Sequence, residues 1–135
     1  MARIFVDTVA WIGLINTSDK LHPQMRKTLS GLRAANHTLL THEFVLLEVA
    51  DALSAPESRR KTVEFIDGLK NIATLEIALA SHDLLTAGWH LYKKRPDKDW
   101  SLTDCISFVL MEQQGLWQAL TSDRHFEQAG FERLL

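Results

Sequence analysis

The chain has 135 residues, of which 46% are hydrophobic and 24% are charged, and its formal net charge is −2. This length suits one domain with a substantial core, and the charge excludes a uniformly basic protein that binds nucleic acid over its whole surface. The single cysteine, Cys105, excludes an internal disulfide and a zinc site built on cysteines, and it suits a reducing compartment.

Short apolar runs alternate with amphipathic stretches along the chain. The first run, residues 4–6, is bulky and largely β-branched, which indicates a strand buried on both faces. Further strands are predicted at 37–41, 73–79, 116–121 and 131–135, the last at a sheet edge. Helices are predicted at 8–15, 22–35, 43–53, 58–69, 81–94, 101–114 and 123–128. Strands that alternate with helices imply a parallel sheet with right-handed crossovers.

Local signals set several of these boundaries. Thr41 is placed to cap the helix 43–53 with its side-chain oxygen. Residues 8–15 are as apolar as a signal-peptide core, but Asp7 precedes them and no small-residue cleavage site follows. No stretch approaches the roughly 20 apolar residues of a membrane span. We therefore expect a soluble, cytoplasmic protein with a single domain over 1–135.

Four acids are candidates for one site: Asp7, Glu48, Asp104 and Asp123. Asp7 and Asp123 each follow a predicted strand, so they are expected at the carboxyl edge of the sheet, where open α/β sheets bind ligands. Glu48 and Asp104 each lie within about two turns of a helix start at that edge. The predicted topology therefore allows all four carboxylates to converge.

The three aspartates also have local alternatives. Asp7 and Asp123 each precede a predicted helix that they can cap, and Asp104 completes a capping box with Ser101. Glu48 has no such role, because it lies mid-helix in an almost wholly apolar segment. Buried glutamates are rare unless they are paired or bound to metal. We therefore expect Glu48 to be largely buried, with a partner from elsewhere in the fold.

A convergent acidic cluster predicts a bound cation. Two carboxylates about 4 Å apart repel each other by about 4 kcal/mol at an effective dielectric constant near 20. Four such groups are hard to retain in a domain stabilised by only about 5–15 kcal/mol, and a divalent cation reverses the sign of this interaction. Carboxylate oxygens favour Mg²⁺ or Mn²⁺, which can orient a phosphodiester and activate a water molecule.

Taken together, these segments resemble the PIN domain family, and especially its small VapC-like toxins. The resemblance covers the whole chain and is carried by the Glu48 helix and by residues 4–8, 101–106 and 120–126. It implies an α/β fold, a three-layer α/β/α sandwich with a central parallel sheet of four to five strands. It also implies a metal-dependent endoribonuclease that cleaves single-stranded or structured RNA, with the acidic site Asp7, Glu48, Asp104 and Asp123. Proteins of this kind usually form homodimers, and many are toxins held inactive by a cognate antitoxin.

Other residues could join this site. Asp99, five residues before Asp104, is either a fifth acid of the site or a solvated loop residue. The candidate substrate-binding residues are Thr8, Ser122, Lys94, Arg95 and Lys98. The basic residues suit RNA phosphates, although those near the end of helix 81–94 can instead complement the helix dipole. Thr8 fits the family pattern after the first acid, whereas Ser122 stands where the family often has asparagine.

Aromatic and histidine side chains near these segments have more than one interpretation. Trp89 and Trp100 are able to stack on bases, but core or dimer contacts are the commoner role of aromatics at such positions. His42, next to Thr41, and His125, two residues after Asp123, are able to approach the site, but we expect both to be structural.

Two other functions compete with the ribonuclease interpretation. A phosphatase of the haloacid dehalogenase type also places an aspartate after its first strand. That chemistry needs a second aspartate two residues later, where this chain has Val9. A non-catalytic RNA- or partner-binding module on the same fold is the alternative from another class. It gives no reason to retain four acids that repel one another.

Overall fold

The structure, a computed structural model, describes residues 2–135 and contains one five-stranded parallel sheet. Its strands are β1 (Arg3–Val6), β2 (Thr38–His42), β3 (Leu75–Ala78), β4 (Gln118–Leu120) and β5 (Glu132–Arg133), in the order β3-β2-β1-β4-β5. The helices are α1 (Thr8–Ile15), α2 (His22–Ala34), α3 (Glu43–Ala52), α4 (Pro56–Leu69), α5 (His82–Lys94), α6 (Leu102–Gln114) and α7 (Arg124–Gln128). Every predicted strand and helix is therefore confirmed, with small differences at the ends.

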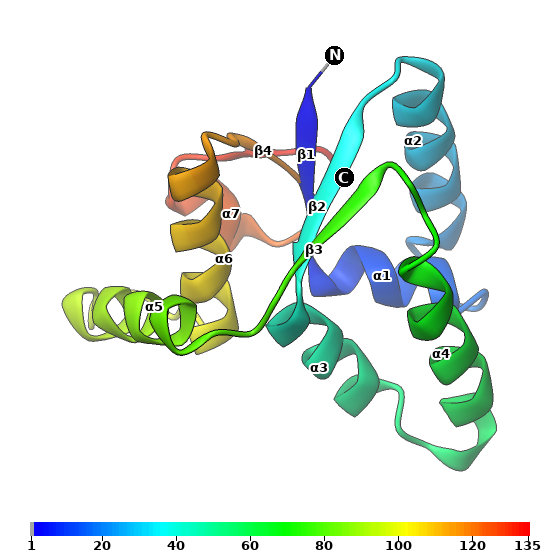
Figure 1. The fold of residues 1–135 in the computed structure, drawn as a ribbon, viewed down its shortest axis with the longest axis horizontal. Coiled ribbons are helices and arrows are strands. Elements are labelled where there is room, and N and C mark those ends of the chain that lie inside the picture. The colour runs from blue at the N-terminus through cyan, green and yellow to red at the C-terminus, as the bar shows by residue number, and fades with distance from the viewer. Residues whose placement is uncertain (1) are drawn as a thin grey trace.

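Helices cover both sides of this sheet, which confirms the predicted three-layer sandwich. In Figure 1, α1, α2 and α4 lie on one side of the strands, and α6 and α7 lie on the other. Helix α5 packs against α6 and so extends the second layer outward. Within the described residues, no helix is both long and apolar enough to cross a membrane.

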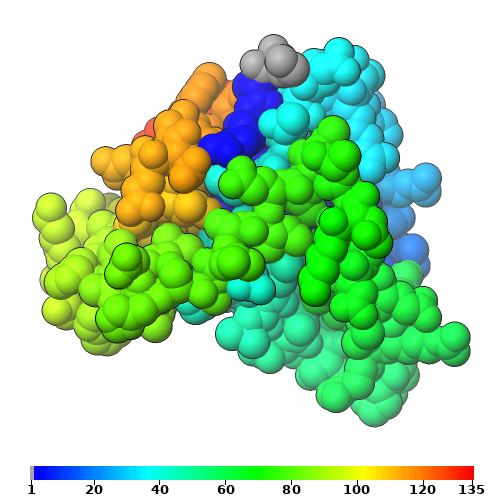
Figure 2. Space-filling view, viewed as in Figure 1, coloured from blue at the N-terminus to red at the C-terminus, as the bar shows by residue number. Residues whose placement is uncertain are grey.

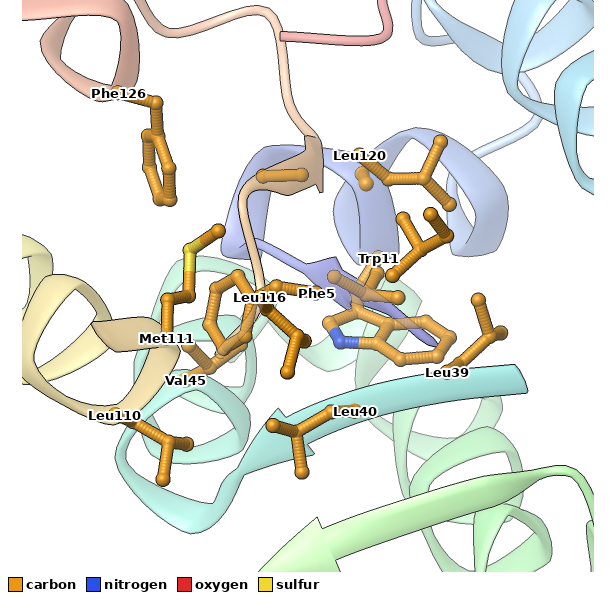
Figure 3. Close-up of a cluster of buried hydrophobic side chains, with 14 of the residues drawn as sticks. Phe5, Trp11, Leu39, Leu40, Val45, Leu110, Met111, Leu116, Leu120 and Phe126 are labelled. Atoms are coloured by element: carbon orange, nitrogen blue, oxygen red, sulfur yellow. The ribbon is translucent and has the colours of Figure 1, made fainter. Parts of the chain in front are cut away.

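Strand β1 is the middle strand of the sheet, and three of its four side chains are buried. Phe5 pairs in register with Leu40 of β2 and with Ala119 of β4. The buried side chains in Figure 3, which include Phe5, Met111 and Phe126, come from both helical layers and from the sheet and point toward one another. This core supports the strand ends from which the acids project.

The predicted cap of α3 is wrong by one residue. His42, not Thr41, is the N-cap, and its Nδ1 accepts a hydrogen bond from the backbone N–H of Val45 at 3.1 Å. Thr41 remains in the strand, where its hydroxyl donates to the carbonyl of Val6 at 2.9 Å. Strand β2 runs one residue further than expected, and its last residue, His42, directly precedes the helix start at Glu43.

The contact between α5 and α6 depends on a glycine. A Cβ added at Gly88 would lie 2.3 Å from Cγ1 of Ile106 and 3.1 Å from its Cα, and Ile106 is 1% exposed. We expect Gly88→Ala to lower the free energy of unfolding by about 1–3 kcal/mol, because the two helices must separate. Urea denaturation measures this change.

Gly68 is the matched control for this substitution. It lies inside α4, and a Cβ there meets nothing within 4 Å. Gly68→Ala should therefore stabilise the protein by up to about 1 kcal/mol, through helix propensity alone. Equal effects of the two substitutions would contradict the close approach of α5 to α6.

Candidate metal centre at the carboxyl edge of the sheet

The candidate site lies where the order of the strands reverses. From β1 the chain builds the sheet outward through β2 and β3, and later returns to place β4 on the other side of β1. Asp7 follows β1 and Asp123 follows β4, so both lie near the gap between these neighbouring strands. The backbone N–H of Asp7 donates to the carbonyl of Leu120 at 3.2 Å, which holds the two strand ends together. Such switch points are the usual ligand-binding crevices of open α/β sheets.

Asp7 does not cap helix α1 with its side chain. Its backbone stands at the N-cap position, but the carboxylate makes no capping hydrogen bond. Instead its Oδ2 accepts a hydrogen bond from the hydroxyl of Thr121 at 2.8 Å. The residue is 4% exposed, and burial raises the pKa of its carboxyl from 3.8 to about 7, with smaller contributions from the charges of Asp104 and Asp123. Asp7 is thus a buried acid without the local role that would explain it.

Asp104 and Asp123 meet around the imidazole of His125. Nδ1 of His125 lies 2.9 Å from Oδ2 of Asp104 and 3.4 Å from Oδ1 of Asp123. One ligand atom from each of these three residues lies within 4.8 Å of the others. Burial raises the pKa of Asp104, and the charge of Asp123 raises it further. These residues and Asp7 therefore form one electrostatically coupled group.

Two of these acids also have the local roles expected as alternatives. Oδ2 of Asp104 accepts from the backbone N–H of Ser101 at 3.2 Å, which completes a capping box on α6. Oδ1 of Asp123 accepts from the backbone N–H of His125 at 2.9 Å and caps α7. In both residues capping fixes the carboxylate in place.

The ring of His125, expected to be structural, lies within the acidic cluster. Although burial lowers the pKa of His125, the hydrogen bond to Asp104 and the charges of Asp123, Asp104 and Asp99 raise it overall. The sequence contained one signal, since His125 lies two residues after an acid that ends a strand. His42, in contrast, is fully buried, and its Nε2 lies 2.8 Å from the hydroxyl of Ser107. His42 is structural, as expected.

Two hydroxyl groups complete the surroundings of Asp7. Thr121 is fully buried, donates to Asp7, and accepts from the backbone N–H of Asp123 at 3.0 Å. It links the acids of two strands, a role that the sequence analysis did not assign. Thr8 is 5% exposed, and its Oγ1 is the one buried side-chain polar atom within residues 2–135 that has no hydrogen-bond partner. Buried hydroxyls normally have a hydrogen-bond partner, so the partner of this one is expected to be a bound group that is not part of the chain.

Glu48 lies outside the group formed by the other three acids. It is half-buried, not largely buried as expected, and makes no hydrogen bond or ion pair with any residue in the range 2–135. It lines a groove together with Thr103, the neighbour of Asp104. Helix α3 buries only Val45 and Val49, and Leu47 is 60% exposed, because no other element of the part that the structure describes covers its outer face. The apolar residues around Glu48 therefore do not enclose it.

The remaining candidates differ in their surroundings. Asp99 is exposed, and its charge acts on His125. Arg95 forms a two-pronged ion pair with Asp97, with both N–O distances at 3.0 Å. Lys98 lies 6.0 Å from the centre of the Trp100 ring. Lys94 is exposed, and Ser122 is half-buried with its carbonyl bonded to Arg133.

This arrangement fits a divalent cation. Three carboxylates lie at one edge, the pKa values of Asp7 and Asp104 are raised by burial, and a buried hydroxyl without a partner follows directly after Asp7. Such an ion offsets the repulsion among the acids, and its bound water can act as partner to a hydroxyl. Asp7, Asp104 and Asp123 are the side chains able to hold it, and His125 is a further potential ligand.

The chain matches a protein family model, a characterised relative and several solved structures. Residues 4–132 match the PIN domain model. The 23S rRNA-specific endonuclease VapC20 of Mycobacterium tuberculosis is 25% identical over 128 residues, which is 95% of each chain.

Solved structures extend this likeness to the fold. The crystal structure of VapC20, a sarcin–ricin loop cleaving toxin, superposes with a TM-score of 0.84 and covers 97% of this chain and 98% of that chain. VapBC2 of Rickettsia felis, bound to a DNA fragment from its promoter, has a TM-score of 0.72 at 16% identity, covering 99% and 98% of the two chains. FitAcB of Neisseria gonorrhoeae has a TM-score of 0.68 at 13% identity, covering 100% and 97%. With the family match spanning nearly all of its length, the chain belongs to the PIN domain family.

Proposed function

We propose that this chain is a divalent-metal-dependent endoribonuclease and the toxin of a toxin–antitoxin pair, acting as a single nuclease domain in the cytoplasm. The observation that carries the proposal is the convergence of Asp7, Asp104 and Asp123 at the switch point between β1 and β4. Glu48 completes the proposed acidic site from the neighbouring groove. Mg²⁺ or Mn²⁺ is the proposed ion, because carboxylate oxygens dominate the site.

The residues of the chain have distinct roles in this proposal. When bound, the ion supplies Lewis-acid stabilisation of the phosphodiester and a water molecule of lowered pKa. Asp7 and the two capped aspartates hold it. Thr121 fixes the orientation of Asp7 through the 2.8 Å hydrogen bond, and His125 together with Ser101 fixes Asp104. Such pre-positioned ligands need no rearrangement when the substrate binds.

The proposed substrate is structured ribosomal RNA. VapC20, which is 25% identical to this chain over 95% of both lengths, is named for its action on 23S rRNA and for cleavage of the sarcin–ricin loop. The proposed contacts to the RNA backbone are residues that offer hydroxyl or cationic groups, namely Thr8, Ser122, Lys94, Arg95 and Lys98. Thr8 and Ser122 adjoin Asp7 and Asp123 in the sequence, and Arg95 and Lys98 line a pocket with Asp99.

The proposal is tested by incubating the purified protein with ribosomes, and with a synthetic sarcin–ricin stem–loop, in Mg²⁺, in Mn²⁺ and in a chelator. A stem–loop with a scrambled loop sequence is the matched control. We expect discrete fragments that require the metal. Cleavage that persists in the chelator would contradict the proposed chemistry. Intact RNA under every condition would favour the non-catalytic binding module.

A cognate antitoxin is the second proposed partner. The Rickettsia felis structure is a complex named VapBC2 on promoter DNA, which supports the idea that this chain also pairs with a second protein. The product of a small reading frame directly upstream of this one is the candidate to test. We expect the two chains to co-purify and the RNA cleavage to be suppressed in the complex.

We propose that the chain forms a homodimer through the outer face of α3 and the first turn of α5, and not through the later turns of α5. Leu47 is 60% exposed and Leu85 is 39% exposed, and both line one groove with the partly buried Phe44 and Leu102. An apolar groove of this kind is stabilised by covering it. We expect Leu47→Lys to shift the mass measured by light scattering from dimer to monomer. Val63→Lys, at a 53% exposed position on α4, is the control and should leave the mass unchanged.

A further inference from the structure

A second pocket lies beside the acidic site, and the proposed mechanism makes little use of it. It has a volume of about 360 Å³ and lies between the end of α5, the loop 95–101 and the start of α6. We call it the aromatic–basic pocket and define it by six of its lining residues: Trp89, Tyr92, Lys93, Arg95, Lys98 and Trp100. In Figure 2, α5 forms the lower left of the visible surface, and no other segment lies in front of it.

Two of its aromatic rings are stacked and open to solvent. Trp89 and Tyr92 lie one turn apart on α5, with ring centres 5.4 Å apart and an angle of 12° between their planes. Their exposed fractions are 46% and 44%. The protein thus keeps a broad, flat aromatic surface in water, whereas the ring of Trp100 is buried and its indole N–H is bonded to Gln128.

Cations surround these rings. Arg95 lies 5.1 Å from the centre of the Trp100 ring and is held there by Asp97. Lys98 approaches Asp97 only at 4.0 Å, and Lys93 has no ion pair with any residue in the range 2–135. Both lysines are therefore available to an anionic ligand. Flat aromatic surfaces with neighbouring cations are the usual means of binding single-stranded nucleic acid, because every base has a face that can stack.

Two residues of the pocket link it to the acidic site. Asp99 lines it, and the charge of Asp99 acts on His125 of that site. Cys105 also lines it and directly follows Asp104. A strand of RNA with one phosphate at the acids is therefore able to place a neighbouring nucleotide in this pocket.

We propose that the aromatic–basic pocket is a subsite for a nucleotide that flanks the cleaved phosphate. The base stacks on the Trp89–Tyr92 surface, and Lys93 and Lys98 contact the adjoining phosphates. This proposal rests on the ribonuclease function and adds a site for an unpaired base to it. RNA is favoured over a second copy of the chain as occupant, because the cations around the pocket complement phosphates.

The test measures binding separately from cleavage. All proteins carry Asp7→Asn so that the RNA stays intact, and binding to a labelled 12-nucleotide single-stranded RNA of mixed sequence is followed by fluorescence anisotropy. We expect the Trp89→Ala/Tyr92→Ala pair to weaken binding about 10-fold. Trp89→Phe/Tyr92→Phe should restore most of it, because phenyl rings still stack. The control is Trp117→Ala, which removes a 60% exposed tryptophan at the opposite, amino-terminal end of β4.

A second probe separates stacking from charge. An RNA of the same length without bases retains the phosphates, so we expect the alanine pair and the parent to bind it equally. The proposal is overturned if the alanine pair binds the normal RNA as Trp117→Ala does, or if the parent binds no RNA. It is also overturned if the pair changes only the oligomeric state, which would assign the stack to a contact between copies. Failure of the ribonuclease function would be a different result. In that case the variants would show the expected binding pattern, but the protein that retains Asp7 would not cleave RNA.

Discussion

Replacing Asp7 by asparagine is expected to lower the rate of RNA cleavage at least about a thousandfold while the fold is retained. The substitution removes one charge from the proposed metal site, and the loss of about 4 kcal/mol of transition-state stabilisation corresponds to a factor of that size. Asparagine has nearly the same shape, and its carbonyl oxygen can still accept the hydrogen bond from Thr121. The change is therefore chemical and not structural.

Cleavage rates are measured on the sarcin–ricin stem–loop in saturating Mn²⁺, and folding is checked by circular dichroism. Asp67→Asn is the matched control, because Asp67 is an exposed aspartate of α4 and does not belong to the acidic site. Cleavage by Asp7→Asn at the rate of this control would mean that a contaminant or a different site performs the reaction.

The second large effect is expected on stability in the absence of metal. The pKa of Asp7 rises from 3.8 to about 7 on folding, so the folded state holds a proton that the unfolded chain releases between these values. Stability from this group is complete below pH 4 and is lost as the pH rises through about 7. The difference between the two pKa values corresponds to about 4 kcal/mol. At pH 8, metal-free Asp7→Asn should therefore be more stable than the parent, by up to this amount.

The comparison must be made between the two proteins, because His42 acts in the opposite direction. Burial lowers its pKa to about 4, so its contribution to stability rises with pH between about 4 and 6.5. That contribution is common to both proteins and cancels in their difference. Urea denaturation at pH 4, 6 and 8 in a chelator measures the difference in stability between the two proteins. Curves for the two proteins that run parallel over this range would contradict the raised pKa of Asp7.

Metal should remove most of this difference in stability at pH 8. An ion at 100 times its dissociation constant stabilises the folded parent by about 2.7 kcal/mol, whereas Asp7→Asn should gain much less. At lower pH the ion competes with the proton on Asp7, so its stabilising effect should diminish below about pH 7. Equal stabilisation of both proteins by Mn²⁺ would place the ion away from Asp7.

The arrangement of the site explains why these effects centre on Asp7. Asp104 and Asp123 have hydrogen bonds to backbone N–H groups at helix starts, which stabilise their charged forms. The side chain of Asp7 makes no such helix-capping contact, and Asp7 is the most buried of the three aspartates. Its main hydrogen bond comes from a neutral hydroxyl, that of Thr121. Of the three aspartates, Asp7 therefore has the free-energy cost of burying its charge offset least by the protein itself.

The sequence by itself determined the order of elements and the edge at which the acids lie. Alternation between apolar strands and amphipathic helices is a local pattern, so all five strands and seven helices within residues 2–135 were predictable. The placement of Asp7 and Asp123 followed as well, because a residue after a parallel strand must lie at the carboxyl edge. The capping box of Asp104 was equally visible, since its partner is three residues away.

Contacts between distant segments were decided only by the tertiary structure. The sequence pattern around Glu48 indicated burial, but burial depends on whether another element covers that face of α3, and within the described chain none does. The position of His125 depends on how α7 meets α6, and the bond from Thr121 to Asp7 joins residues 114 positions apart. Likewise, the Trp89–Tyr92 stack was a pair of helical neighbours in the sequence, and only the fold places it beside the acids. Periodicity specifies which face a residue occupies, whereas packing of the whole chain specifies what that face meets.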